Sequence, residues 1–290
     1  MAKDKPKPTQ WHPIFAELLR PLLQDYYDVQ TNVPVGDAPR EADILLVRRN
    51  SDRPTPFRGL WRHLTTWNVL EFKGPSVSAR LSDLGLLVEL GLGIHRRLNE
   101  ERLRQKQSRL KPAAASFWYI VRTMGVRFLA GARQQLGDLE EIEGGFWRSQ
   151  VLQHLVFLVD SETFASEPDS VPLHLLFQRA PEQERHLGSL VVEQPHFLEW
   201  YGRWLSTFHP QVWAEVREMA RGKHKELEFD FTWIKEEMTP ANQLKMLESL
   251  GIDRILELIG PKKLIDVIGV DHLLSNLSPA DLKKLKERLK

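Results

Sequence analysis

The chain contains no cysteine. This absence excludes disulfide scaffolds, thiolate zinc sites and cysteine nucleophiles, and it fits a reducing compartment. No apolar run approaches the roughly 20 residues that a helix needs to cross a bilayer, and the segment Met1–Pro8 lacks the hydrophobic region of a signal peptide. We therefore expect a cytoplasmic protein that does not enter a membrane.

Several signatures of catalytic sites are also missing. The sequence has no Gly-x-x-x-x-Gly-Lys loop, no Gly-x-Gly-x-x-Gly fingerprint, no Gly-x-Ser-x-Gly elbow and no His-Glu-x-x-His helix. Its ten histidines are scattered, without metal-ligand spacing. We therefore interpret His12, His63 and His95 as surface or capping residues, although His12 and His63 could lie near the opening of a site.

Net charge is nearly absent as well, but its distribution is uneven. Residues 1–111 hold 19 Lys and Arg against 13 Asp and Glu, whereas the remainder holds 21 against 26. The length of 290 residues and a hydrophobic content of 42% provide an ample core for one large domain with an appendage, or for two domains.

The most informative segment present is the apolar stretch 68–75, which contains Glu71 and Lys73. Side chains alternate along a strand, so Glu71 and Lys73 share one face while Phe72 takes the other. Burying either charge alone costs several kcal/mol, so the pair suggests a reacting group and a metal ligand near the end of a sheet. A carboxylate two residues from a lysine is weak evidence by itself, and its context has to decide.

The upstream sequence supplies that context. The spacing of apolar residues predicts an amphipathic helix over 13–26 that carries Glu17, and strands over 27–35 and 40–49. Asp43 lies at the start of the second strand. The order of helix and three strands allows Glu17, Asp43, Glu71 and Lys73 to form one cluster.

This pattern of Asp43, Glu71-Phe72-Lys73 and a preceding helix with Glu17 resembles the PD-(D/E)XK nuclease superfamily, which has the restriction-endonuclease-like fold. The resemblance covers residues 10–130 and is closest to the recombination-promoting nuclease and transposase-like branch. The spacer between Asp43 and Glu71 is longer and richer in proline than the pattern has, and the leading acidic dipeptide is reduced to Asp43.

The resemblance implies an enzyme, a Mg²⁺-dependent deoxyribonuclease, most simply an endonuclease, in a mobile-element, recombination or defence context. Asp43, Glu71, the backbone carbonyl of Phe72 and Glu17 would hold Mg²⁺, for which Mn²⁺ could substitute. Lys73 would position the attacking water or stabilise the transition state.

The expected partner is nucleic acid, because basic residues flank the proposed site, and the resemblance implies that this nucleic acid is DNA. A set of arginines is assigned to DNA binding: Arg48, Arg58, Arg62, Arg80, Arg96 and Arg97. Arg80 lies early in the next helix and is the candidate for a contact with the scissile phosphate. The alternative interpretation is that Arg80 is an exposed arginine with no role in the site.

The rest of the chain completes an α/β prediction, with a central mixed sheet flanked by helices. We expect helices over 76–104, 126–136 and 181–221, a strand over 116–122, and β-rich patterns over 145–160 and 171–177. Trp200, Trp204, Phe208 and Trp213 are interpreted as core residues rather than platforms for bases.

The C-terminal region has a nine-residue period, in which turn-forming residues recur at Asn242, Gly251, Gly260, Gly269 and Ser278. We predict a nuclease-like domain over 1–220, a linker over 221–240 and an all-helical repeat module over 241–290. Short helices are marginal alone, so this module would associate with itself or with a protein partner, or it would cap its own domain.

Two alternatives to cleavage remain at this point. One is a nuclease fold that binds DNA or protein without catalysis. The other is a structural ion pair of Glu71 with Lys73 or Arg80, which would leave Asp43 far from Glu71.

Overall fold

The computed structural model describes residues 11–34, 41–50, 53–177 and 179–221. The chain divides into two compact units. One unit lies within residues 10–202, and residues 203–221 are the described part of the other. The predicted repeat module at 241–290 and residues 222–240 of the predicted linker lie outside the described residues.

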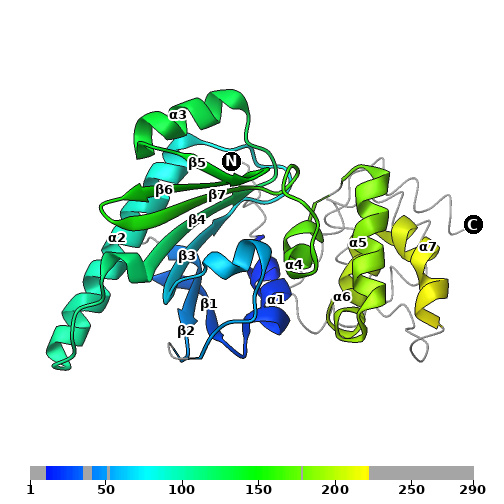
Figure 1. Ribbon diagram of the computed structural model, residues 1–290, viewed down its shortest axis with the longest axis horizontal. Coiled ribbons are helices and arrows are strands. Elements are labelled where there is room, and N and C mark those ends of the chain that lie inside the picture. The colour runs from blue at the N-terminus through cyan, green and yellow to red at the C-terminus, as the bar shows by residue number, and fades with distance from the viewer. Residues whose placement is uncertain (1–10, 35–40, 51–52, 178, 222–290) are drawn as a thin grey trace, which may run out of the picture. The chain divides into compact units, whose positions relative to one another are not determined.

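The unit within residues 10–202 is built on a seven-stranded mixed sheet with the order β1-β2-β3-β4-β7-β6-β5 (Figure 1). Strands β3, β4 and β7 run parallel to one another at its centre, and the remaining neighbours pair antiparallel. The strands are β1 (Tyr27–Pro34), β2 (Glu41–Arg48), β3 (Trp67–Phe72), β4 (Ala115–Val121), β5 (Glu140–Glu143), β6 (Phe146–Val151) and β7 (His154–Asp160).

Helices cover both faces of this sheet (Figure 1). Helices α2 and α3 lie on one face, and α1 and α4 lie on the other. The helices of the described chain are α1 (His12–Leu23), α2 (Leu81–Arg104), α3 (Val126–Leu136), α4 (Val171–His174), α5 (Pro181–Glu193), α6 (Pro195–Phe208) and α7 (Pro210–Arg221). The predicted α/β class with a flanked mixed sheet is therefore confirmed.

Alternation along β4 explains how one strand serves two cores. Phe117, Tyr119 and Val121 belong to the apolar cluster beneath α2 and α3. Trp118 points to the other face, where its ring lies 6.0 Å from that of Trp61 in the 3₁₀ helix η1 (Gly59–His63). All seven residues of β4 are buried, as its continuous apolar sequence predicted.

The β-rich pattern expected over 171–177 is wrong, because residues Val171–His174 form α4. A short apolar run does not distinguish a buried strand from a buried helix. Pro172 lies in the first turn of α4, where its missing N–H costs nothing. Within the described residues, no helix combines the length and apolar character needed to span a membrane.

The parallel strands β3, β4 and β7 end on the same side of the sheet, at Phe72, Val121 and Asp160. We call this side the carboxyl edge. Ligands of open α/β sheets bind outside the carboxyl ends of the strands, so this edge is the first place to look for a site.

Candidate active site at the carboxyl edge

Asp43 and Glu71 meet where strands β2 and β3 separate. The antiparallel ladder between them ends at the pair Ile44 and Leu70. Beyond this pair the Asp43 carboxylate accepts a hydrogen bond from the Phe72 N–H at 3.1 Å and so replaces the next link of the ladder. The Asp43 carboxylate therefore lies beside the backbone of the residue that follows Glu71, and the Asp43 charge raises the pKa of Glu71. This proximity argues against an isolated structural ion pair at Glu71.

Lys73 is held between two carboxylates. Its ammonium lies 2.6 Å from Glu71 Oε1 and 3.1 Å from Asp83 Oδ2, and Asp83 stands in the first turn of α2. The side chains of Glu71, Lys73 and Asp83 are only 13%, 18% and 22% exposed. Glu71 and Lys73 share one face, as predicted, while Phe72 stacks on Phe15 of α1 on the other face, with the ring centroids 4.2 Å apart.

His12 is the fifth charged or polar group of the site. Its Nδ1 lies 3.3 Å from Asp43 Oδ1, and its Nε2 lies 2.7 Å from the side-chain oxygen of Asn32. His12 is thus buried against Asp43 rather than on the surface, which corrects its interpretation as a surface or capping residue. The neighbouring Trp11 packs on Gly74, where an added Cβ would lie 2.1 Å from the Trp11 ring. This contact ties the start of α1 to the residue that follows Lys73.

The pKa values reflect burial and an excess of acidic groups. Burial, followed by the Asp43 charge, raises the pKa of Glu71 to about 7, although Lys73 opposes both effects. Burial also raises the pKa of Asp43, against the influence of His12 and the Phe72 N–H. Burial alone would lower the pKa of Lys73, but its two carboxylate partners outweigh it and raise this pKa. Lys73 is therefore a permanent cation beside a carboxyl group that titrates near neutrality.

The donor set fits Mg²⁺ in part. Mg²⁺ is usually held by one or two carboxylates and keeps several waters, and Asp43 and Glu71 supply two such ligands. Within the described residues, however, no group of three or more His, Asp or Glu side chains is arranged to hold a metal ion.

Glu17 does not join Asp43 and Glu71. Its side chain is 51% exposed, and its carboxylate pairs with Arg20 at 2.9 Å. The buried face of α1 carries Phe15, Leu18 and Leu19, so Glu17 is turned away from the sheet. The structure therefore places this predicted metal ligand outside the acidic pair.

Of the arginines assigned to DNA binding, Arg80 lies nearest the site. It precedes α2, its backbone N–H donates to the Tyr119 hydroxyl at 3.1 Å, and its side chain is exposed. Tyr119 stands opposite Glu71 in the parallel ladder. Arg80 therefore belongs to the carboxyl edge.

Arg48, Arg58, Arg62 and Arg96 lie farther from the site, whereas the Arg97 side chain reaches the end of β1, where Pro34 pairs with Glu41, two residues before Asp43. Arg48 ends β2, five residues from Asp43, which is about 17 Å along a strand. Arg58 and Arg62 flank or occupy η1, which packs through Trp61 on the face opposite Glu71. Arg96 and Arg97 follow Asp83 in α2 by 13 and 14 residues, which is about 20 Å. Arg96 pairs with Glu100 there, and Arg97 donates to the Pro34 carbonyl.

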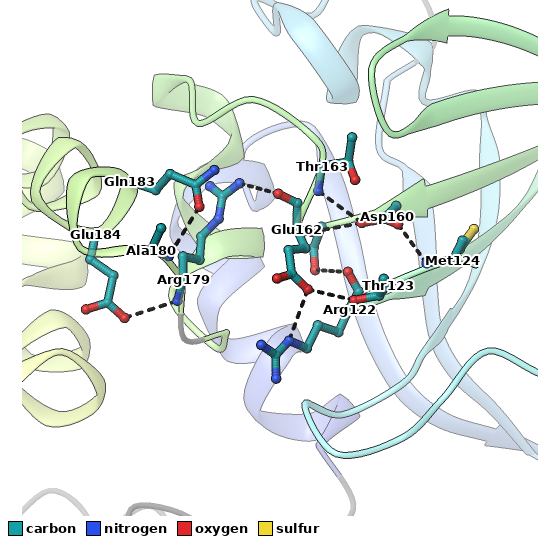
Figure 2. Close-up of polar contacts among 11 residues, drawn as sticks. Arg122, Thr123, Met124, Asp160, Glu162, Thr163, Arg179, Ala180, Gln183 and Glu184 are labelled. Atoms are coloured by element: carbon teal, nitrogen blue, oxygen red, sulfur yellow. Dashed lines mark hydrogen bonds and ion pairs between the residues drawn. The ribbon is translucent and has the colours of Figure 1, made fainter. Parts of the chain in front are cut away.

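A second polar cluster occupies the same edge at the ends of β4 and β7 (Figure 2). The Asp160 carboxylate accepts the backbone N–H groups of Met124, Glu162 and Thr163. The Glu162 carboxylate accepts the Thr123 hydroxyl at 2.7 Å and lies 3.4 Å from Arg122. These contacts hold the loops after β4 and β7 in place, so this cluster supports the edge and offers no second acidic pair like Asp43 and Glu71.

Sequence reasoning missed Asp83 and misread His12. The sequence prediction began this helix at residue 76, and only its observed start at Leu81 puts Asp83 in the first turn, within reach of Lys73. Comparison of the chain with protein-family models, curated proteins and solved structures found no match. The site therefore has to be judged by its own geometry.

Proposed function

We propose that this protein is a metal-dependent nuclease that hydrolyses phosphodiester bonds of DNA. One observation carries the proposal, which is the meeting of Asp43 and Glu71 at the carboxyl edge with the Lys73 ammonium bound to Glu71. A helix before the strands, an antiparallel step from β2 to β3 and a helix after Lys73 agree with the resemblance to the PD-(D/E)XK superfamily. The assignment of the chain to the restriction-endonuclease-like fold is part of this proposal.

Each residue of the pair has a role that its surroundings support. Asp43 and Glu71, with the Phe72 carbonyl, would hold Mg²⁺. When bound, Mg²⁺ lowers the pKa of a coordinated water and offsets negative charge at phosphorus. Lys73, kept charged by its carboxylate partners, would stabilise the developing charge on the phosphate or orient the attacking water.

The raised pKa of Glu71 agrees with a cation site. Two partly buried carboxyl groups beside a single ammonium repel each other, and a divalent cation would relieve this repulsion. Part of the free energy of Mg²⁺ binding would thus come from relief of the repulsion between Asp43 and Glu71 that is present in the metal-free protein.

Plasmid cleavage tests the function directly. Supercoiled plasmid should be cut with Mg²⁺ or Mn²⁺ and remain intact with EDTA. Asp43→Ala, Glu71→Ala and Lys73→Ala should each abolish cutting while the circular dichroism spectrum keeps its native form. Glu17→Ala is the matched acidic control, and it should retain activity because Glu17 pairs with Arg20 away from the site. Undiminished cutting by all three site variants would refute the assignment.

The alternative of a nuclease fold that binds DNA or protein without cutting also has an observation in its favour. Among the described residues, Asp43 and Glu71 are the two carboxylates that meet, and His12 and Lys73 already bind one oxygen of each. Calorimetry separates the two functions, since the non-cleaving module would take up neither Mg²⁺ nor Mn²⁺.

A further inference from the structure

Lys73 and a metal ion would compete for the same carboxylate. The Lys73 ammonium lies 2.6 Å from Glu71 Oε1. A Mg²⁺ ion bound to Glu71 would lie about 2.1 Å from its oxygen ligand, so both cations would crowd one carboxylate. The two cations would repel each other across this partly buried carboxylate, and this repulsion favours movement of the ammonium away from Glu71.

Asp83 is already in contact with the displaced group. Its Oδ2 lies 3.1 Å from the Lys73 ammonium, so the lysine can lose Glu71 without entering solvent. The first turn of α2 fixes Asp83, because the Asp83 N–H bonds to the Arg80 carbonyl and the Arg80 N–H is anchored on the Tyr119 hydroxyl. The Tyr119 side chain is fully buried, so this anchor is rigid.

We propose that Asp83 is a positioning residue that retains the Lys73 ammonium when a divalent cation binds Asp43 and Glu71. This inference rests on the proposed function, and it adds that the site exchanges one cation for another. Without Asp83, the lysine has Glu71 as its one remaining carboxylate partner among those described, and it resists the incoming metal.

Calorimetric titration of the full chain with Mg²⁺ tests this exchange in four proteins, which are the wild type, Asp83→Asn, Lys73→Gln and the double variant. Asp83→Asn should weaken Mg²⁺ binding about tenfold, a size common for coupled neighbours. In the Lys73→Gln background the same change should have almost no effect, because no ammonium remains to be retained. Glu100→Gln, in the exposed part of α2, is the matched control and should bind Mg²⁺ as the wild type does.

The outcomes separate the two proposals. If Asp83→Asn weakens Mg²⁺ binding equally in the wild-type and Lys73→Gln backgrounds, Asp83 is a direct metal ligand and the positioning role is overturned. If Asp83→Asn weakens Mg²⁺ binding in neither background, the positioning role is overturned as well. Wild-type protein that binds Mg²⁺ with the expected coupling but leaves DNA intact would refute the nuclease and support the exchange. Wild-type protein that cuts DNA, while Asp83→Asn binds Mg²⁺ as tightly as the wild type does, would refute the exchange alone. Absence of Mg²⁺ binding would overturn both.

Discussion

At the scale of single residues, Glu71 shows how a functional site opposes stability. Burial and the Asp43 charge both disfavour its ionised form, and Lys73 compensates only in part. A glutamine of the same shape would remove the repulsion and keep an acceptor for the Lys73 ammonium. Glu71, which we propose as a metal ligand, is thus a residue whose ionised form destabilises the metal-free fold.

This cost has a defined pH dependence. The pKa of Glu71 is about 7 in the folded state against 4.5 for the free group, so the folded state binds the proton more tightly. Its stabilising contribution is complete below about pH 4.5 and is lost as the pH rises through 7. We predict that Glu71→Gln unfolds with a free energy about 1 to 3 kcal/mol above the wild type at pH 8.

Urea unfolding in EDTA at pH 4.5 and pH 8 measures the difference, which should nearly vanish at the lower pH. A variant that is equally stable or less stable at pH 8 would show that Lys73 fully compensates the buried charge. The same change at Glu17, which is exposed, should leave stability unaltered at both pH values.

The sequence predicted these residues unequally. Strand alternation placed Glu71 and Lys73 on one face without any knowledge of tertiary structure, and the contact at 2.6 Å confirms it. Helical periodicity could place Glu17 on α1 but did not establish how α1 is rotated against the sheet. His12 was noted as lying near the opening of a site but was interpreted as a surface or capping residue, because its contact with Asp43 depends on where the start of α1 docks.

At the scale of elements, strong local patterns were reliable and short ones were not. The strand predicted over 116–122 lies within one residue of β4 at each end, and the predicted boundaries of α3 agree with the structure, because β4 is almost entirely apolar and α3 is strongly amphipathic. The segment that forms α4 contains only a few apolar residues, and its neighbours decide its conformation.

The turn between β6 and β7 is an element that its sequence does not favour. Leu152 and Gln153 have φ of 49° and 67°, as two-residue hairpin turns of the I′ type require. Side chains other than Gly, Asn and Asp are strained in this region, by about 1 to 2 kcal/mol per residue. Leu152 is 71% exposed, so it gains little from packing in return.

We predict that the double change Leu152→Asn and Gln153→Gly stabilises the protein by about 1 kcal/mol, since Asn-Gly is the preferred I′ sequence. The midpoint of urea unfolding should rise without a change in slope. Leu152→Ala, which removes the exposed apolar side chain and keeps the strain, is the control and should give no such gain. An unchanged midpoint in the double variant would show that the turn is not strained.

At the scale of the whole molecule, the question is which surface a polyanion would meet. The basic excess of residues 1–111 pointed to the loop before β3. The structure places Arg58 and Arg62 of that loop on the face opposite Glu71 and Lys73. By contrast, α2 and α3 both begin at the carboxyl edge, where the exposed side chains of Arg80 and Arg127 lie beside helix N-termini. If the protein binds DNA as proposed, the phosphate backbone would pass over Arg80 and Arg127.

A pair of matched double variants can decide between these surfaces. Arg80→Gln with Arg127→Gln should weaken DNA binding and lower the slope of log affinity against log salt by about 1.8, which is the loss of two phosphate contacts on duplex DNA. Arg58→Gln with Arg62→Gln removes the same charge and should leave both quantities nearly unchanged. Binding is measured by fluorescence anisotropy across a salt series with Ca²⁺ in place of Mg²⁺, so that the DNA stays intact. The reverse result would place the nucleic acid on the η1 face, from which Lys73 is separated by the sheet itself.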